Sequence, residues 1–186
     1  MKQYWKLTWA LALLACVALA PVAAAQQAEA EPKLEVGDDA PELEITDWLK
    51  GKAVKIQEGE GDTVYVVEFW ATWCPPCRTS IPHLTELQKK YKDRGVVIIG
   101  VTMESAEKVK PWVEEMGDQM DYTVAVDGER KTSKAYMIAA GEAGIPHAFV
   151  IDKEGKLAWH GHPMDKAFEA KLEELAPPKT EEAPAE

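Results

Sequence analysis

The sequence predicts an α/β protein with a mainly parallel central sheet, and two observations support that prediction. Nearly continuous apolar runs at 63–70 and 96–101 are rich in β-branched residues, which is typical of strands buried on both faces. Segments with helical spacing of apolar residues follow these runs, and strands that alternate with helices favour parallel pairing. The chain has 186 residues, enough for one domain with a proper core.

The first half of the predicted domain contains a strand, a helix and a second strand. Residues 34–54 carry only short strand signals, from which we expect an N-terminal hairpin extension. A helix should follow the strand at 63–70 and end at Gly95, close to the C′ position that favours glycine. The apolar side of this helix is formed by Ile81, Leu84, Leu87 and Tyr91.

The next stretch again pairs a helix with a strand. Apolar residues within 109–116 have helical spacing, and Pro111 predicts that this helix begins or kinks there. A strand is expected at 122–126. Residues 130–140 have a helical pattern, and Gly141 can end it.

A hairpin and a helix are expected to close the domain. The runs 147–151 and 156–160 flank a turn that contains Gly155, which predicts antiparallel strands next to the parallel ones. The combined prediction is a central mixed sheet flanked by helices. The last helix is striped by Met164, Phe168, Leu172 and Leu175.

Residues 1–25 have the pattern of a signal peptide. Lys2 and Lys6 form a positive n-region, and Ala23–Ala25 offers an A-x-A cleavage site. The apolar run between them falls short of the ~20 residues that span a bilayer. We therefore expect an exported, periplasmic protein with a cleavable signal. The alternatives are an anchor formed by the uncleaved segment or by a lipidated Cys16.

The remaining terminal segments are expected to lie outside the fold. Residues 26–32 are rich in Ala, Glu and Gln and are interpreted as a linker, and 176–186 as a disordered acidic tail. The folded domain is therefore predicted over 33–175. The net charge of −11 disfavours nucleic-acid binding, because the phosphate backbone is also negative. We expect a monomer.

Cys74 and Cys77 are separated by two prolines where the buried strand meets the helix. Such a pair can be a redox couple, half of a metal site, or chance. A structural zinc site needs about four ligands, and the nearby sequence adds only His83. At a helix N-terminus the unpaired amides favour an anion and lower the pKa of a Cys74 thiol. Because Pro75 and Pro76 lack N–H groups, the first amide that can point at this sulfur belongs to Cys77.

The chemistry predicted for this pair is thiol–disulfide exchange. Cys74, expected to be exposed at the strand end, attacks a partner disulfide, and Cys77 resolves the mixed disulfide by closing the Cys74–Cys77 bond. Glu68 is the candidate general base for Cys77, because a carboxyl group inside a buried strand has a raised pKa. The alternative is a partly exposed Glu68 at a strand end. No cofactor or metal is expected beyond the redox-active disulfide.

The segment Phe69–Arg78, with Pro82 five residues after Cys77, resembles the active site of the thioredoxin superfamily. Residues 36–41 are similar to the opening of its exported TlpA-like thiol–disulfide oxidoreductases. The resemblance spans roughly residues 34–175 and implies a thioredoxin-like fold, with Glu68 as the family's buried acid. It also implies that Pro82 kinks the helix.

The resemblance extends to Gly144-Ile145-Pro146, which is similar to the family's cis-proline loop. It implies that Pro146 is cis and packs beside the cysteines, and that backbone groups of Ile145 pair with an extended substrate strand. Trp73 is either an apolar substrate platform or a shield for the site. The family's role implies protein thiol or disulfide substrates and a reductant fed by a membrane thiol donor.

Two other functions stay open at this point. A thiol peroxidase of the same fold needs Thr three residues before the reactive Cys, where this chain has Ala71, with Thr72 one position late. A non-catalytic copper- or zinc-binding module would use Cys74, Cys77 and a histidine.

Histidines near the C-terminal hairpin are weaker signals. His160, His162 and Met164 are interpreted as a solvated turn rather than a metal site. His147 follows Pro146 and either modulates the Cys74 thiolate or is an ordinary strand residue.

Overall fold

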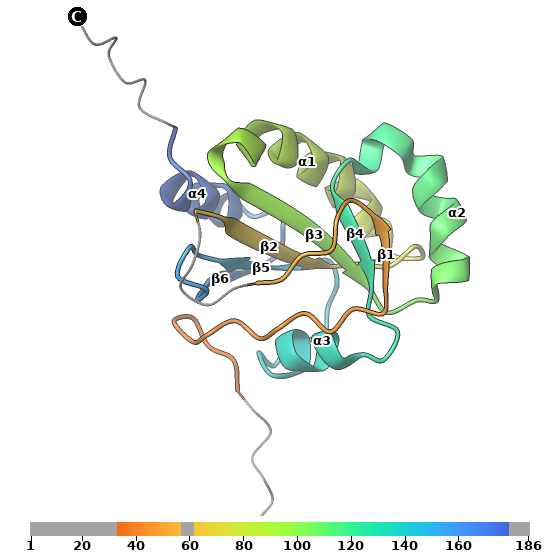
Figure 1. Ribbon diagram of the computed structural model, residues 1–186, viewed down its shortest axis with the longest axis horizontal. Coiled ribbons are helices and arrows are strands. Elements are labelled where there is room, and N and C mark those ends of the chain that lie inside the picture. Colours follow the sequence, from red (N-terminus) through yellow and green to blue (C-terminus); the bar gives the residue numbers. More distant parts are fainter. Residues whose placement is uncertain (1–32, 57–61, 179–186) are drawn as a thin grey trace, which may run out of the picture. The chain divides into compact units, whose positions relative to one another are not determined.

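The computed structural model describes residues 33–56 and 62–178, drawn in colour in Figure 1. The predicted signal peptide, the linker, Cys16 and most of the predicted tail lie outside these residues. The strands are β1 (Asp47–Lys50), β2 (Val64–Phe69), β3 (Val96–Thr102), β4 (Thr123–Val126), β5 (His147–Ile151) and β6 (Leu157–Gly161).

These strands form one mixed sheet in the order β1-β4-β3-β2-β5-β6. The central strands β4, β3 and β2 run parallel, whereas β1, β5 and β6 are antiparallel to their neighbours. The predicted α/β class, with a central mixed sheet, is therefore confirmed. The helices are α1 (Pro75–Tyr91), α2 (Ala106–Met116), α3 (Lys131–Ser133) and α4 (Lys166–Leu175).

Shorter helical turns extend these helices. A 3-10 turn at Lys92–Arg94 follows α1, another at Gly117–Met120 follows α2, and a π-helical turn at Lys134–Ile138 continues α3. Gly95 ends the first of them in the left-handed conformation at φ +83°, as expected from its position. Within the described residues, no helix is both long and apolar enough to cross a membrane.

Of the two outcomes predicted for Pro111, a helix start at this residue is wrong. Helix α2 begins at Ala106 after an N-cap at Ser105, so Pro111 lies inside it rather than at its first position. Proline removes one hydrogen bond, the one to the carbonyl of Glu107. Glu107 is exposed, where water can satisfy that carbonyl. The burial of Val109 and Val113 on one side of α2 therefore outweighs the loss of one backbone hydrogen bond at Pro111.

The expected N-terminal hairpin is not formed by the described residues. This segment contributes β1, which pairs with β4, and an isolated bridge between Asp39 and Lys156. Its apolar residues, such as Leu43 and Ile45, pack against the core instead. The segment therefore runs along the sheet beside α3, as Figure 1 shows, because its partners lie far away in the sequence.

The sheet separates two core clusters because alternate strand residues point to opposite faces. On one face, α1, α2 and α4 contribute Leu84, Val109 and Phe168 to the cluster that contains both cysteines. We call this the cysteine face. On the other, the π-helical turn after α3 contributes Tyr136 to a cluster with Phe149. We call this the α3 face; α1 and α3 lie on opposite sides of the sheet in Figure 1.

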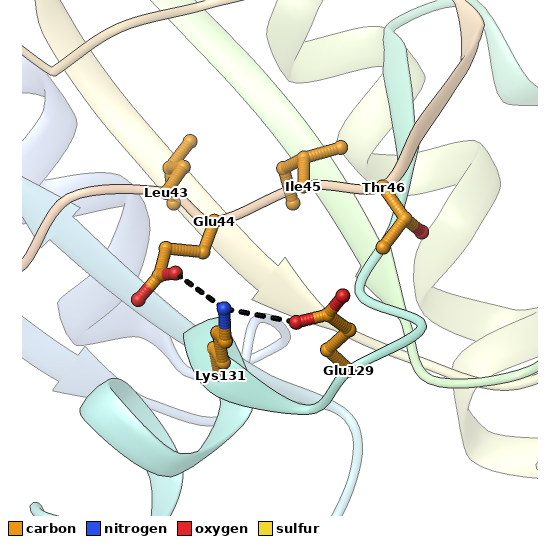
Figure 2. A pocket seen from close by; sticks show the side chains of 6 residues that line it. All are labelled: Leu43, Glu44, Ile45, Thr46, Glu129 and Lys131. Atoms are coloured by element: carbon orange, nitrogen blue, oxygen red, sulfur yellow. Dashed lines mark ion pairs between the residues drawn. The ribbon is translucent and has the colours of Figure 1, made fainter.

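A pocket on the α3 face lies between the N-terminal segment and the start of α3 (Figure 2). The Nζ atom of Lys131 lies between the carboxylates of Glu44, at 3.2 Å, and Glu129, at 2.9 Å. All three side chains are more than half exposed. The two carboxylates neutralise the lysine, so we interpret this pocket as a surface clasp rather than a reactive site.

Candidate active site at the Cys74–Cys77 pair

The two cysteines stand at the start of α1 and form a disulfide, with their Cα atoms 5.3 Å apart. Cys74 is the N-cap residue, and Pro75 and Pro76 occupy the first two helical positions. The backbone N–H of Cys77 donates to the Cys74 sulfur at 3.2 Å. The predicted local geometry is confirmed, because the two prolines leave this amide as the first donor available to the sulfur.

Cys74 is not exposed, which corrects the sequence-based expectation. It is 2% exposed, whereas Trp73 beside it is 65% exposed. The Cys74 sulfur lies 3.7 Å from the carbonyl oxygen of Ile145, and Ile145 packs against the same core cluster. The loop that covers the sulfur is 71 positions away in the sequence, so no local pattern could reveal this burial.

The loop opposite Cys74 has the expected conformation. The Ile145–Pro146 peptide bond is cis, and Pro146 is buried while Ile145 is half-buried. The structure therefore brings together Cys74, Cys77, Ile145 and Pro146. Pro82 lies inside α1, as the resemblance implied.

Glu68 lies on β2 and is completely buried. Val66 and Trp70 are each two positions away from Glu68, and both belong to the cysteine-face cluster. Because residues two apart in a strand point to the same face, the Glu68 side chain also points to the cysteine face. Neither carboxylate oxygen has a hydrogen-bond partner within the described residues. Burial raises the pKa of Glu68 to about 8. The alternative of a partly exposed Glu68 is therefore wrong.

Two further polar atoms near Glu68 have no hydrogen-bond partner in the described part of the chain, and the sequence did not point to them. They are the hydroxyl of Tyr122 and the ring nitrogen of Trp70. Burial, and then the Glu68 charge, raises the pKa of Tyr122. Gly100 pairs with Glu68 in the sheet, and a Cβ atom there would lie 2.9 Å from the Tyr122 ring and 3.1 Å from the Trp70 nitrogen.

Gly100 therefore makes room for both rings beside the buried carboxyl group. The signal that could have revealed this arrangement is a glycine in the middle of the apolar run 96–101, because glycine in a strand often marks a close approach.

Another interaction missed from the sequence holds the loop before Cys74. Glu104 accepts hydrogen bonds from the Thr72 backbone N–H at 2.6 Å and the Thr72 hydroxyl at 3.0 Å. Arg78 donates to the Thr72 carbonyl at 2.9 and 2.7 Å. Burial opposes ionisation of Glu104, but the hydrogen bonds from Lys108 and Thr72 outweigh it and lower its pKa. These contacts hold the backbone of Thr72, and with it the loop that leads into Cys74 and α1, in one position.

His147 follows Pro146 but does not join the cysteines. Its ring lies 5.0 Å from that of Phe149, in the α3-face cluster. Among the described residues, no group of three ligating side chains includes Cys74 or Cys77, which are joined in the disulfide. His162 and Met164 are exposed.

The comparisons with known proteins agree with this geometry. A model of the AhpC/TSA family matches residues 36–160. Thiol-disulfide oxidoreductase ResA of Bacillus thuringiensis subsp. konkukian is 33% identical over 150 residues, which cover 79% of this chain and 82% of that protein.

Two solved structures are also similar. One, a thiol:disulfide interchange protein of the thioredoxin family from Chlorobium tepidum TLS, is 28% identical with a TM-score of 0.59, over 80% of this chain and 99% of that chain. A peroxiredoxin-like protein from Aquifex aeolicus is 25% identical with a TM-score of 0.60, over 77% and 89%. The chain therefore belongs to the AhpC/TSA family and is a TlpA-like thiol–disulfide oxidoreductase of the thioredoxin superfamily.

Proposed function

We propose that this oxidoreductase is an exported reductant of protein disulfides that works through a mixed disulfide on Cys74. One observation carries the proposal. The Cys74 sulfur accepts a hydrogen bond from the Cys77 amide at the N-terminus of α1, and it lies directly beside the Ile145–Pro146 loop. The relatives named thiol-disulfide oxidoreductase and thiol:disulfide interchange protein support this chemistry. The redox-active group is the Cys74–Cys77 disulfide itself.

In the first step, the reduced Cys74 thiolate attacks one sulfur of a substrate disulfide. The new bond joins Cys74 to the substrate, and the other substrate sulfur leaves as a thiolate that takes up a proton. The Cys77 amide and the positive end of the α1 dipole stabilise the thiolate before attack. This stabilisation makes Cys74, rather than the fully buried Cys77, the nucleophile toward substrate.

In the second step, Cys77 attacks the Cys74 sulfur and releases the substrate as its second thiol. Two electrons have then moved from the cysteine pair to the substrate, and the protein disulfide is restored. Cys77 must lose its proton, and Glu68 accepts it. A carboxyl pKa of about 8 is close to the ~8.5 of an ordinary thiol, so the transfer costs little free energy.

Substrate recognition is assigned to the surface around the covered sulfur. Trp73 is the large exposed apolar side chain next to Cys74, and it offers a contact platform. The backbone of Ile145 offers hydrogen bonds to an extended substrate strand, in addition to its contact with the sulfur. Because Cys74 is buried, substrate binding must uncover its sulfur.

The remaining parts of the proposal rest on the N-terminal sequence and the relatives. The signal-like residues 1–25 support export to the periplasm, with the anchored forms as alternatives. A membrane thiol donor would return the disulfide to the reduced state, and we propose that the enzyme acts as a monomer.

A trapping experiment tests this function. Cys77→Ser removes the resolving thiol, so we expect the variant to accumulate mixed disulfides with substrate proteins on Cys74, which mass spectrometry identifies. Cys74→Ser is the matched control and should trap nothing. We also expect the parent protein to reduce insulin disulfides. Absence of both trapping and insulin reduction would exclude the proposed function.

A thiol peroxidase is the second candidate, supported by the peroxiredoxin-like neighbour. The geometry gives it less support. Ala71 occupies the position where a peroxidase needs Thr, and the Thr72 hydroxyl donates to Glu104 at 3.0 Å. Consumption of hydrogen peroxide by the reduced protein, faster than its reduction of insulin, would favour this candidate.

A further inference from the structure

Three side chains with metal-ligating groups meet on the α3 face, away from the disulfide. They are Glu142, which follows the π-helical turn, His147 at the start of β5, and His160 on β6. One potential ligand atom from each residue lies within 4.8 Å of the other two. The proposed enzymatic function uses none of them.

The two imidazoles have a spacing close to that of two ligands on one metal ion. The Nε2 atom of His147 and the Nδ1 atom of His160 are 3.1 Å apart. Two Zn–N bonds of about 2.0–2.1 Å at a tetrahedral angle place their nitrogens about 3.3 Å apart. In this structure the two nitrogens form a hydrogen bond with each other, and their distance is also near the ligand spacing.

Glu142 offers a carboxylate oxygen as the third potential ligand. Its Oε1 atom lies 3.8 Å from His160 Nδ1. Its Oε2 atom lies 3.8 Å from His147 Nδ1, which is not the ring nitrogen that faces His160. Its side chain is 37% exposed, so a small rotation can close the remaining distance. Its backbone is held by a hydrogen bond to the Met137 carbonyl at 2.8 Å.

The histidine rings are held in place by packing. Phe149 pairs with His160 in the sheet and stacks on its ring at 5.4 Å, with 16° between the planes. The same phenylalanine contacts His147 at 5.0 Å. Ligands whose rings are fixed before binding lose little conformational entropy when a metal arrives.

We propose that Glu142, His147 and His160 bind a borderline divalent cation, Zn²⁺ or Cu²⁺, at a site separate from the redox disulfide. Two imidazoles and one carboxylate suit these ions, and three protein ligands leave a fourth position for water. Glu142 and His147 stand at the two ends of residues 143–146, which include Ile145 and Pro146. A bound cation would therefore tie both ends of the cis-proline loop to β6.

The test is calorimetric titration of Zn²⁺ into the oxidised full chain, without a polyhistidine tag and with Cys16 alkylated. The Cys74–Cys77 pair is then a disulfide and cannot bind metal. We expect saturable 1:1 binding. Loss of supporting residues around metal sites costs 10–100-fold in affinity, so His160→Gln and Glu142→Gln should each weaken binding at least about tenfold.

Two controls separate this site from other sources of binding. His83→Gln, on α1, should bind Zn²⁺ like the parent. Paramagnetic resonance of bound Cu²⁺ should show two imidazole nitrogens in the parent and one in His160→Gln. Circular dichroism checks that the variants fold, and Glu142→Gln alters a partly exposed side chain in case His160→Gln does not fold.

A second readout tests the link to the loop. Zn²⁺ should slow hydrogen exchange of the amides at residues 143–145 in the parent but not in Glu142→Gln. The proposal is overturned if Zn²⁺ and Cu²⁺ show no saturable binding, or if Glu142→Gln and His160→Gln bind like the parent. Unchanged hydrogen exchange would overturn the loop connection.

Discussion

Two buried tyrosines, one on each face of the sheet, differ in whether the hydroxyl group is paired. Tyr136, on the α3 face, is buried, and its hydroxyl donates to the Pro41 carbonyl at 2.5 Å. Tyr122, on the cysteine face, is also buried, but its hydroxyl has no partner among residues 33–56 and 62–178. Within the same residues, the oxygens of Glu68 and the ring nitrogen of Trp70 on that face also lack partners. Buried polar atoms are normally paired, and each exception needs an explanation.

We interpret the unpaired atoms around Glu68 as stability given up for the proposed proton transfer. Ionising a buried carboxyl group without a hydrogen bond is costly, and this cost is what holds the Glu68 pKa in the range of a thiol. The α3 face has no such task in the proposed exchange reaction. Its aromatic residues Phe69, Tyr136 and Phe149 pack edge to face or tilted, with centroids 5.3–6.1 Å apart.

The largest expected effect is on the pH dependence of stability through Glu68. Its pKa is raised from 4.5 to about 8 on folding, so the folded state holds this proton more tightly than the unfolded state. Stability should therefore fall as the pH rises from 4.5 to 8, by on the order of 5 kcal/mol at 1.36 kcal/mol per pKa unit. Glu68→Gln should remove this slope and slow the resolution of mixed disulfides.

Urea unfolding of the oxidised protein between pH 4 and 9 measures this slope. Glu86→Gln, an exposed position on α1, is the matched control and should keep the wild-type profile. Parallel pH profiles for the parent and Glu68→Gln would contradict a raised pKa and weaken the case for Glu68 as the proton acceptor.

A pair of matched substitutions sharpens the comparison between the two faces. Tyr136→Phe leaves the half-buried Pro41 carbonyl without its donor, and we expect a loss of about 1–3 kcal/mol in the free energy of unfolding. Tyr122→Phe removes a hydroxyl that has no partner, so it should be neutral or stabilising. Equal losses in both variants would show that the Tyr122 hydroxyl is paired, for example through a buried water.

The smallest effect is expected at the surface clasp of the α3 face. Lys131 lies between Glu44 and Glu129 with all three side chains exposed, and such ion pairs contribute little in water. Lys131→Ala should leave the thermal midpoint and the insulin reductase rate unchanged. A clear fall in the midpoint would mean that the clasp, more than the core contacts of the N-terminal segment, holds that segment in place.

Local patterns were sufficient to predict most of the sheet and the chemistry of the cysteine pair. The strands at 64–69 and 147–151 and the cysteines at a helix start are governed by hydrogen bonds and side-chain periodicity over a few residues. The burial of Glu68 was predicted from its place in an apolar run, although the sequence also allowed a partly exposed position at the strand end.

The placement of the cysteine pair at a helix N-terminus follows from local sequence, because two prolines leave only the Cys77 amide to face the Cys74 sulfur. Long-range packing was needed for three other features: Ile145 lies over that sulfur, Tyr122 approaches Glu68 beside Gly100, and β1 pairs with β4 instead of forming a hairpin. These contacts join residues far apart in the chain. They depend on the order of strands in the sheet, and periodicity does not encode that order.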